Sequence, residues 1–208
     1  MYWKKNVPPC FLPFLNSYVR KKQSGGNHRE IEYKNNHLIL RVLTAEYADA
    51  VLSFYRRNRE QFDIYETDKP DHFYTKAFIQ SLLTAEYNAF VAGKHIRFFL
   101  FDTNFPDKII GTVSFSDIKK GAFCSCTTGY KIDKEFQHLG YGRRMLTMAL
   151  KILVTEMHMH RVEAYIAPQN TASISLATKL GFIPEGTAYS YVYLRGKWED
   201  HLRFVYIS

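Results

Sequence analysis

Gly140 and Gly142 stand with one residue between them in EFQHLGYGRRML, residues 135–146, where an amphipathic helix is expected to begin. A glycine inside a helix or strand costs roughly 0.5–1 kcal/mol relative to alanine, so the pair indicates an unusual backbone conformation or a close approach. The first N–H groups of a helix lack partners within it and, with the positive end of the helix dipole, attract anions. The segment therefore predicts a phosphate or pyrophosphate site, with a plain turn as the alternative.

Two common nucleotide-binding loops do not fit this segment. No lysine followed by serine or threonine comes after the glycines, and Met145 stands where a third glycine would complete the dinucleotide pattern. The chemistry predicted from the residues is thus anion binding at a strand-loop-helix unit. Its ligand is not specified at this level.

The elements that position this loop alternate along the chain, which predicts a mixed α/β architecture. A flexible break at QSGGN, residues 23–27, separates a basic arm of residues 1–30 from one domain of residues 31–208. The predicted strands cover residues 37–43, 97–102, 109–118, 124–133 and 161–167, with two more around a turn at Gly196. The predicted helices follow a Thr44 cap, span residues 73–90 and 143–157, and run from an Asn170 cap to a stop at Gly181.

Charge and cysteine content limit the class of protein. The chain carries a formal charge of +8, and its first 36 residues hold seven lysines and arginines against two glutamates. Such an arm either contacts an anionic partner such as the ribosome or RNA, or is a solvated terminus. Three cysteines, with Cys124 and Cys126 on one face of a predicted strand, favour the cytoplasm over a disulfide-bonded secreted protein. No metal-ligand spacing is found, and CFLPFL, residues 10–15, is too short for a membrane span.

Several motifs in register resemble one family. QHLGYG is similar to the acetyl-coenzyme A signature Q/R-x-x-G-x-G/A of the GNAT superfamily of N-acetyltransferases, and NTASISLATKLGFIPEG, residues 170–186, resembles the segment after its fifth strand. The order of TGYKID, QHLGYG, RVEAYIAPQN, LGFIPEG and GKWEDH most resembles the ribosomal-protein alanine N-acetyltransferase branch of the RimJ/RimL type. The resemblance implies a twisted mixed sheet of about seven strands, flanked by helices, in which the fourth and fifth strands splay apart.

The resemblance also implies where acetyl-CoA binds. The pantetheine arm would pair with the fourth strand at Tyr130, Lys131 and Ile132, and Asn170 would lie beside it. The pyrophosphate would rest on a run of N–H groups, with Gln137 at its entrance and then His138, Leu139, Gly140, Tyr141, Gly142 and Arg143. Arg143 and Arg144 either contact phosphates or are solvated residues at a helix start.

Catalysis in this superfamily is direct attack of a free amine on the thioester. Ser173 resembles the serine that some relatives use to protonate the departing thiol, with a helix-capping hydroxyl as the alternative. The glutamates that serve relatives as base are replaced by Thr128 and Val192, so a water relayed by Asn170, Tyr130 or a backbone carbonyl would take the proton. An α-amine titrates near 8 and a lysine near 10.4, so the missing base favours an α-amine acceptor.

The acceptor is expected beside the C-terminal hairpin. Tyr189, Tyr191, Tyr193 and Trp198 are candidates to line it, and cross-strand packing explains them equally well. The leading hypothesis is an N-acetyltransferase acting on a protein N-terminus, such as that of a ribosomal protein. The alternatives are acetylation of a small amine (a polyamine, an antibiotic or an amino acid) and a non-catalytic module that binds acyl-CoA or RNA.

Overall fold

One mixed sheet organises residues 31–208, which are the residues that the computed structural model describes. The predicted basic arm, residues 1–30, lies outside them. The sheet has eight strands in the order β1-β2-β3-β4-β5-β6-β8-β7, and every neighbouring pair is antiparallel except β5 with β6. The strands are β1 Ile31–Asn35, β2 Leu38–Val42, β3 Ile96–Asp102, β4 Gly111–Lys119, β5 Ser125–Ile132, β6 Arg161–Ile166, β7 Ile183–Leu194 and β8 Lys197–Ile207.

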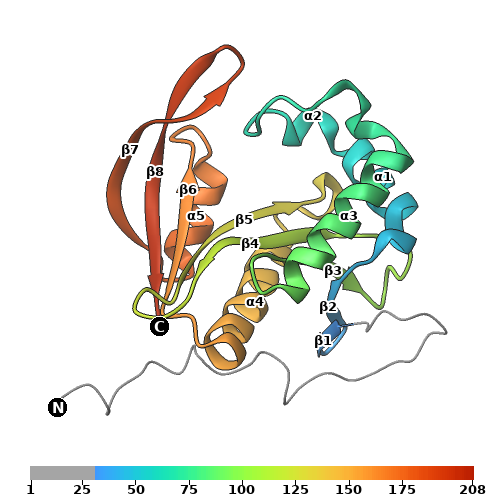
Figure 1. Ribbon diagram of the computed structural model, residues 1–208, viewed down its shortest axis with the longest axis horizontal. Helices are drawn as coiled ribbons and strands as arrows, with labels where there is room; N and C mark the ends of the chain where they lie inside the picture. The colour runs from blue at the N-terminus through green and yellow to red at the C-terminus, as the bar shows by residue number, and fades with distance from the viewer. Residues whose placement is uncertain (1–30) are drawn as a thin grey trace.

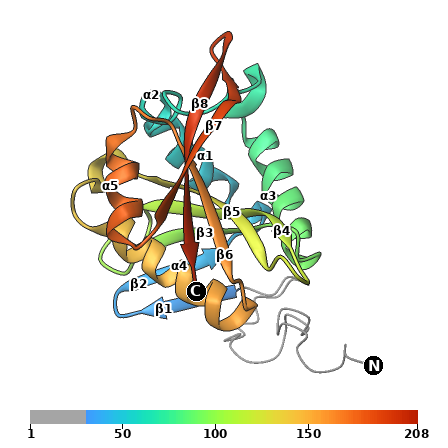
Figure 2. The same ribbon diagram turned by 90° about the vertical axis from the view of Figure 1, so that its left-hand side faces the viewer.

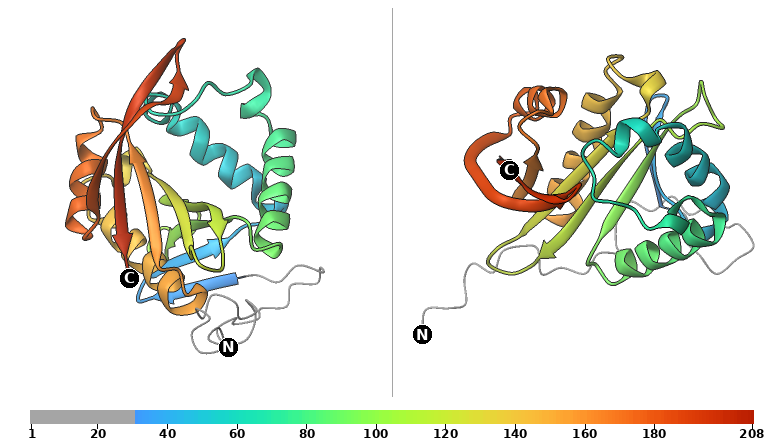
Figure 3. Two further views of the ribbon diagram at one scale, coloured as in Figure 1. Left: turned by 60° about the vertical axis from the view of Figure 1, so that its left-hand side comes forward. Right: turned by 90° about the horizontal axis from the view of Figure 1, so that it is seen from above.

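Helices cover both faces of the sheet (Figures 1 and 3). They are α1 Ala48–Arg57, α2 Arg59–Phe62, α3 Lys76–Val91, α4 Tyr141–Met157 and α5 Thr171–Lys179. The apolar stripe of α4 is buried against β1–β6 and β8, while α1 and α3 bury a second cluster rich in phenylalanine against β2 and β3. In the part of the chain that the structure describes, no helix is both long and apolar enough to cross a bilayer.

The predicted mixed α/β architecture and most of its elements are confirmed, with four corrections. The sheet has eight strands and not about seven, because the prediction missed β1. The IEYKN sequence of β1 carries too few apolar residues to be recognised as a strand without its partner β2. The side chain of Thr44 caps no helix, and a 3-10 turn precedes α1. Helix α4 begins at Tyr141, two residues early, because Gly140 is its N-cap. Cys124 has φ of +39° and precedes β5, so it does not continue the alternation of that strand.

The two central strands β5 and β6 separate part of the way along. They pair in parallel over only four residues of β5, from Ser125 opposite Arg161 to Thr128 opposite Ala164. Strand β5 continues to Ile132 along β4, whereas β6 continues to Ile166 along β8. Figure 2 shows β6 and β8 turning away from β5. These are the fourth and fifth strands of the expected fold, and they splay apart as expected.

Candidate active site

Strand β5 has an unpaired backbone edge beyond the point where it leaves β6. The N–H of Asp133 donates to the carbonyl of Ile110 at 2.8 Å, which places the Asp133 amide on the β4 side. Backbone groups alternate along a strand, so the N–H and C=O groups of Tyr130 and Ile132 face away from β4. The Ile132 carbonyl accepts from Gln61 Nε2 at 2.9 Å, while the Tyr130 backbone faces the side that β6 has left. This edge can pair with an extended amide-bearing chain.

A run of free amides follows β5 directly. Within the described residues, none of the N–H groups of residues 137–143 donates to an acceptor, and the first backbone bond of α4 runs from Arg144 N to Gly140 O at 3.1 Å. His138 and Gly140 have φ of +58° and +79°, so both residues adopt the left-handed backbone conformation and bend the loop. A loop of free amides at a helix N-terminus has the geometry that suits an anion.

Glycine is required at the two positions of this loop for different structural reasons. A Cβ on Gly140 would meet nothing within 4 Å, so its φ of +79° is what requires glycine. A Cβ on Gly142 would lie 3.2 Å from Leu176 Cδ2 and 3.4 Å from Ile132 Cγ1. Gly142 therefore lets α4 pack closely on β5 and α5, which is the close approach that the glycine pair indicated.

The loop is fixed at its start by a buried carboxylate. Asp133 is fully buried, and its side chain accepts from Arg57 and from Asn58 Nδ2 at 2.9 Å. Asn58 Oδ1 in turn accepts from the Lys134 amide at 2.8 Å. The end of α1 thus holds the chain where it leaves β5, so the following amides are presented on a rigid base.

The loop is also fixed at its end, by Tyr141. This first residue of α4 is buried, and its hydroxyl donates to Asp102 Oδ2 at 2.8 Å. Asp102 lies at the end of β3 and also accepts from the Asn104 amide at 2.8 Å. Although burial opposes it, the hydrogen bonds from Asn104 and Tyr141 and the nearby His37 lower the pKa of Asp102. The side chain of Tyr141 is a structural anchor, and its amide remains available to a ligand.

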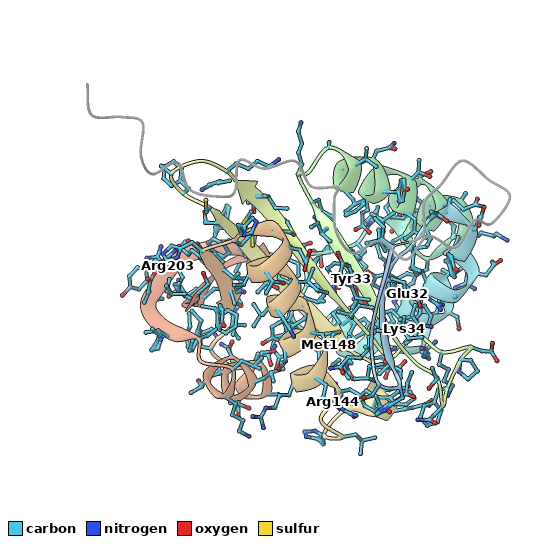
Figure 4. The ribbon with its side chains drawn as sticks, turned by 90° about the horizontal axis from the view of Figure 1, so that it is seen from below. Glu32, Tyr33, Lys34, Arg144, Met148 and Arg203 are labelled. Atoms are coloured by element: carbon cyan, nitrogen blue, oxygen red, sulfur yellow. The ribbon has the colours of Figure 1, made fainter. Side chains whose placement is uncertain are left out.

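The two arginines after the loop differ in their surroundings. Arg144 stacks on the Tyr141 ring at 4.4 Å, and its guanidinium contacts His37 Nε2 at 3.1 Å and donates to the Leu139 carbonyl at 3.3 Å. It borders a hollow of about 420 Å³ between α4 and the β1–β2 turn, where Figure 4 shows it beside that turn and Met148 further along α4. Arg143 makes no such contact within the described residues. Of the two, Arg143 is the one free to reach a phosphate.

Asn170, Ser173 and Tyr130 meet at the start of α5. Asn170 Oδ1 accepts from the Ser173 amide at 3.1 Å, which confirms Asn170 as the cap of α5. The Tyr130 hydroxyl donates to the Ser173 carbonyl at 3.1 Å, and burial raises the pKa of Tyr130 to about 12, so the phenol stays protonated. The Ser173 hydroxyl makes no hydrogen bond within residues 31–208, so it is not the cap. It remains free to act as a proton donor.

The face of the sheet opposite to α4 carries aromatic and charged groups. The side chain of Lys131 pairs there with Glu66 and lies 5.9 Å from the ring centres of Tyr55 in α1 and Phe62 in α2. On β6, Tyr165 alternates with core residues and therefore faces that same side.

Tyr191 from β7 belongs to this face. It stacks on Tyr165 with ring centres 4.2 Å apart, and the Tyr165 hydroxyl donates to Glu163 Oε2 at 2.8 Å. Although burial opposes it, hydrogen bonds from Arg161 and Tyr165 lower the pKa of Glu163. Among the predicted acceptor-side residues, Tyr191 is the one that the structure places beside Tyr165 and Glu163.

The other acceptor candidates lie further along the hairpin. Tyr193 and Trp198 pack edge to face at 5.5 Å near its tip, and Tyr189 is 80% exposed. Figure 1 shows this tip and α2 at the same end of the molecule, both above β5 in that view.

Sequence reasoning missed several residues that build the site. Asp102, Arg57 and Gln61 carry no local signal, because their partners lie far away in the sequence. Tyr165 could have been found, since RVEAYIA alternates polar and apolar residues and so places Glu163 and Tyr165 on one face. Among the described residues, no group of three or more His, Cys, Asp or Glu side chains is arranged to hold a metal ion.

Comparison with known proteins agrees with this geometry. Residues 37–183 match the family model described as an acetyltransferase (GNAT) domain. The chain is 30% identical over 179 residues to ribosomal protein uS5-alanine N-acetyltransferase of Escherichia coli, covering 85% of this chain and 90% of that protein. It is 30% identical over 172 residues to the probable N-acetyltransferase YjcK of Bacillus subtilis, covering 81% and 92%. The solved ribosomal-protein-S5-alanine acetyltransferase of Vibrio fischeri superposes with a TM-score of 0.80 at 29% identity, covering 85% and 96%. The chain belongs to the GNAT family and is an N-acetyltransferase.

Proposed function

We propose that this enzyme transfers the acetyl group of acetyl-CoA to the free α-amine of a protein N-terminus, and that a ribosomal protein supplies that terminus. The observation that carries the proposal is the continuity of the free amides of residues 137–143 with the open backbone edge at Tyr130. A pyrophosphate suits the first and an amide-bearing pantetheine arm suits the second. Acetyl-CoA has both groups in that order, so the residues present fit it.

Different residues bind different parts of acetyl-CoA. Acetyl-CoA supplies an activated thioester. Gln137 and the amides of residues 138–143 hold its phosphates on the α4 side, and Arg143 adds a positive charge there. The open backbone edge at Tyr130 aligns the pantetheine, with Asn170 holding the first turn of α5 beside it. The backbone of Lys131 faces β4 and the Ile132 carbonyl already accepts from Gln61, so the predicted pairing reduces to Tyr130 and the Ile132 amide.

The Ser173 hydroxyl protonates the sulfur. As the amine nitrogen bonds to the acetyl carbon and the carbon-sulfur bond breaks, Ser173 gives its proton to the sulfur and regains one from solvent. The proton lost by the amine passes to water. No carboxylate base is needed for an acceptor that is partly neutral at physiological pH, as an α-amine is.

The electrostatics of the opposite face favour a peptide terminus over a polyamine. Glu66 is paired with Lys69 and Lys131, and Glu163 with Arg161. These carboxylates are already paired with lysine or arginine, which lowers the charge that they offer to a polycation. Aromatic groups around Tyr191 suit the first side chains of a peptide. The E. coli relative is named for an alanine terminus of ribosomal protein uS5, which supports the same substrate class here.

Thiol release tests the proposal. Purified full-length protein is given acetyl-CoA with peptides bearing a free α-amine, with the same peptides blocked at the N-terminus, and with polyamines, antibiotics and free amino acids. We expect release confined to the unblocked peptides, with alanine-terminal sequences of ribosomal proteins the fastest. Release with small amines alone would replace the proposal by its small-molecule alternative.

The role of the basic arm and the cytoplasmic location stay predictions. Loss of a salt-sensitive RNA affinity on removing residues 1–30 would support contact with the ribosome, because phosphate contacts weaken steeply with salt.

A further inference from the structure

Thr128 carries a buried hydroxyl without a partner. Its Oγ1 makes no hydrogen bond within the described residues, and the residue is only 6% exposed. The other buried side-chain atom of this kind in residues 31–208, His95 Nε2, has Glu86 Oε1 3.9 Å away. Leaving a hydroxyl buried and unpaired is unfavourable, so such a group in a native structure calls for an explanation.

None of the described neighbours of Thr128 forms a hydrogen bond with this hydroxyl. Across the ladders stand Phe115 on β4 and Ala164 on β6, both buried and apolar. Two residues along β5 on the same face lies Tyr130, whose hydroxyl is already committed to the Ser173 carbonyl. A satisfied counterpart exists nearby: the buried Thr112 Oγ1 on β4 donates to the Phe98 carbonyl at 3.0 Å.

The position of Thr128 in the sheet indicates what would complete it. Thr128 is the last residue of β5 that pairs with β6, so it marks the closed end of the gap between these strands. The free amides of residues 137–143 follow the other end of β5. Thr128 and Ile132 are four positions apart along the strand, a span of roughly 13 Å. A ligand with its phosphates on the loop and its arm along β5 therefore directs its far end, the acyl end, toward Thr128.

We propose that the Thr128 hydroxyl donates a hydrogen bond to the carbonyl oxygen of the acetyl thioester, so that the bound acyl group supplies the partner the folded chain lacks. The inference rests on the proposed function and adds to it a residue that distinguishes acetyl-CoA from CoA. The bond also draws electron density from the carbonyl carbon that the amine attacks.

The test compares Thr128→Val, which removes the hydroxyl and keeps the branched shape, with Thr128→Ser, which keeps the hydroxyl. Thr112→Val is the matched control for loss of a satisfied hydroxyl. Thermal unfolding is measured on the free full-length proteins, and the affinities for acetyl-CoA and for CoA are measured separately by calorimetry.

We expect Thr128→Val to unfold at the wild-type temperature or about 2–4 °C above it, because it removes an unpaired group, whereas Thr112→Val unfolds lower. We expect Thr128→Val to bind acetyl-CoA about 5- to 10-fold more weakly with its CoA affinity unchanged, and Thr128→Ser to bind both like wild type.

Three results would overturn the inference. Wild-type affinity of Thr128→Val for acetyl-CoA would show that the hydroxyl does not meet the acyl group. An equal loss for CoA would place its contact elsewhere on the ligand, and a lowered unfolding temperature for Thr128→Val would mean that the hydroxyl has a partner within the protein. If the wild-type protein binds neither molecule, the proposed function itself fails, and this result is distinct from the other three.

Discussion

The hydroxyl of Tyr141 donates to the buried carboxylate of Asp102 at 2.8 Å, which joins the first residue of α4 to the last residue of β3. The free amides of residues 137–143 lie on both sides of Tyr141 in the chain and include its own. The orientation of the loop therefore depends on a contact with a strand 39 residues earlier in the chain.

Removing this hydroxyl should loosen the start of α4. Tyr141→Phe leaves the ring in place and deprives Asp102 of a hydrogen bond, so we expect the free energy of unfolding to fall by about 1.5–3 kcal/mol in urea denaturation. Tyr206→Phe is the control, because the Tyr206 hydroxyl makes no hydrogen bond within the described residues. Equal stability of both variants would show that the bond contributes nothing.

Asp102 should make stability depend on pH in the acid range. Its pKa in the folded protein lies below the ordinary 3.8, so its contribution is complete above that value and is lost as the pH falls through the lower folded pKa. The stability advantage of wild type over Asp102→Asn should therefore be constant near neutral pH and shrink on acidification below about 4. Urea denaturation at a series of pH values measures it, and an advantage that does not change with pH would contradict the assignment.

The two glycines of the loop should respond differently to alanine. Gly140→Ala places a side chain in the left-handed region, which costs about 1–2 kcal/mol. Gly142→Ala adds a methyl group 3.2 Å from the flexible end of Leu176 and gains helix propensity, so its stability should stay within about 1 kcal/mol of wild type. The reverse order, measured by urea denaturation, would mean that packing outweighs backbone conformation at this loop.

Ser173 should affect turnover and not binding. The cap of α5 uses the Ser173 amide, so Ser173→Ala keeps the cap and removes only the hydroxyl. We expect kcat to fall roughly 10²-fold, as for loss of a general acid, with unchanged affinity for acetyl-CoA. Ser175→Ala, an exposed change in the same helix, should have wild-type kinetics. A Ser173→Ala enzyme with wild-type kcat would remove Ser173 from the mechanism.

Tyr191 should affect the acceptor and not the acetyl donor. Tyr191→Ala removes the ring that stacks on Tyr165, so we expect KM for the acceptor peptide to rise about 3- to 10-fold with KM for acetyl-CoA unchanged. Tyr193→Ala, nearer the hairpin tip, should have a smaller effect. If only KM for acetyl-CoA rises in Tyr191→Ala, the acceptor does not bind on this face.

Local patterns in the sequence determined many of the helices, strands and turns of this protein. The glycine spacing, the apolar stripe of α4 and the Asn170 cap each act within a few residues, so they predicted the strand-loop-helix unit and the start of α5. The same locality explains the errors. Strand β1 forms because β2 pairs with it, and its own five residues do not predict a strand. The first residue of α4 is set by the backbone angle of Gly140, which the residue type alone does not specify.

The tertiary structure alone decided which distant groups meet. The pairs Tyr141–Asp102, Tyr130–Ser173 and Tyr165–Tyr191 join residues from different elements, and each depends on strand register and helix packing across the whole domain. The unpaired hydroxyl of Thr128 belongs to the same class. Its isolation follows from where β5 and β6 part and from the apolar residues on both sides, because hydrogen-bond partners are assigned by the fold and not by neighbours in the chain.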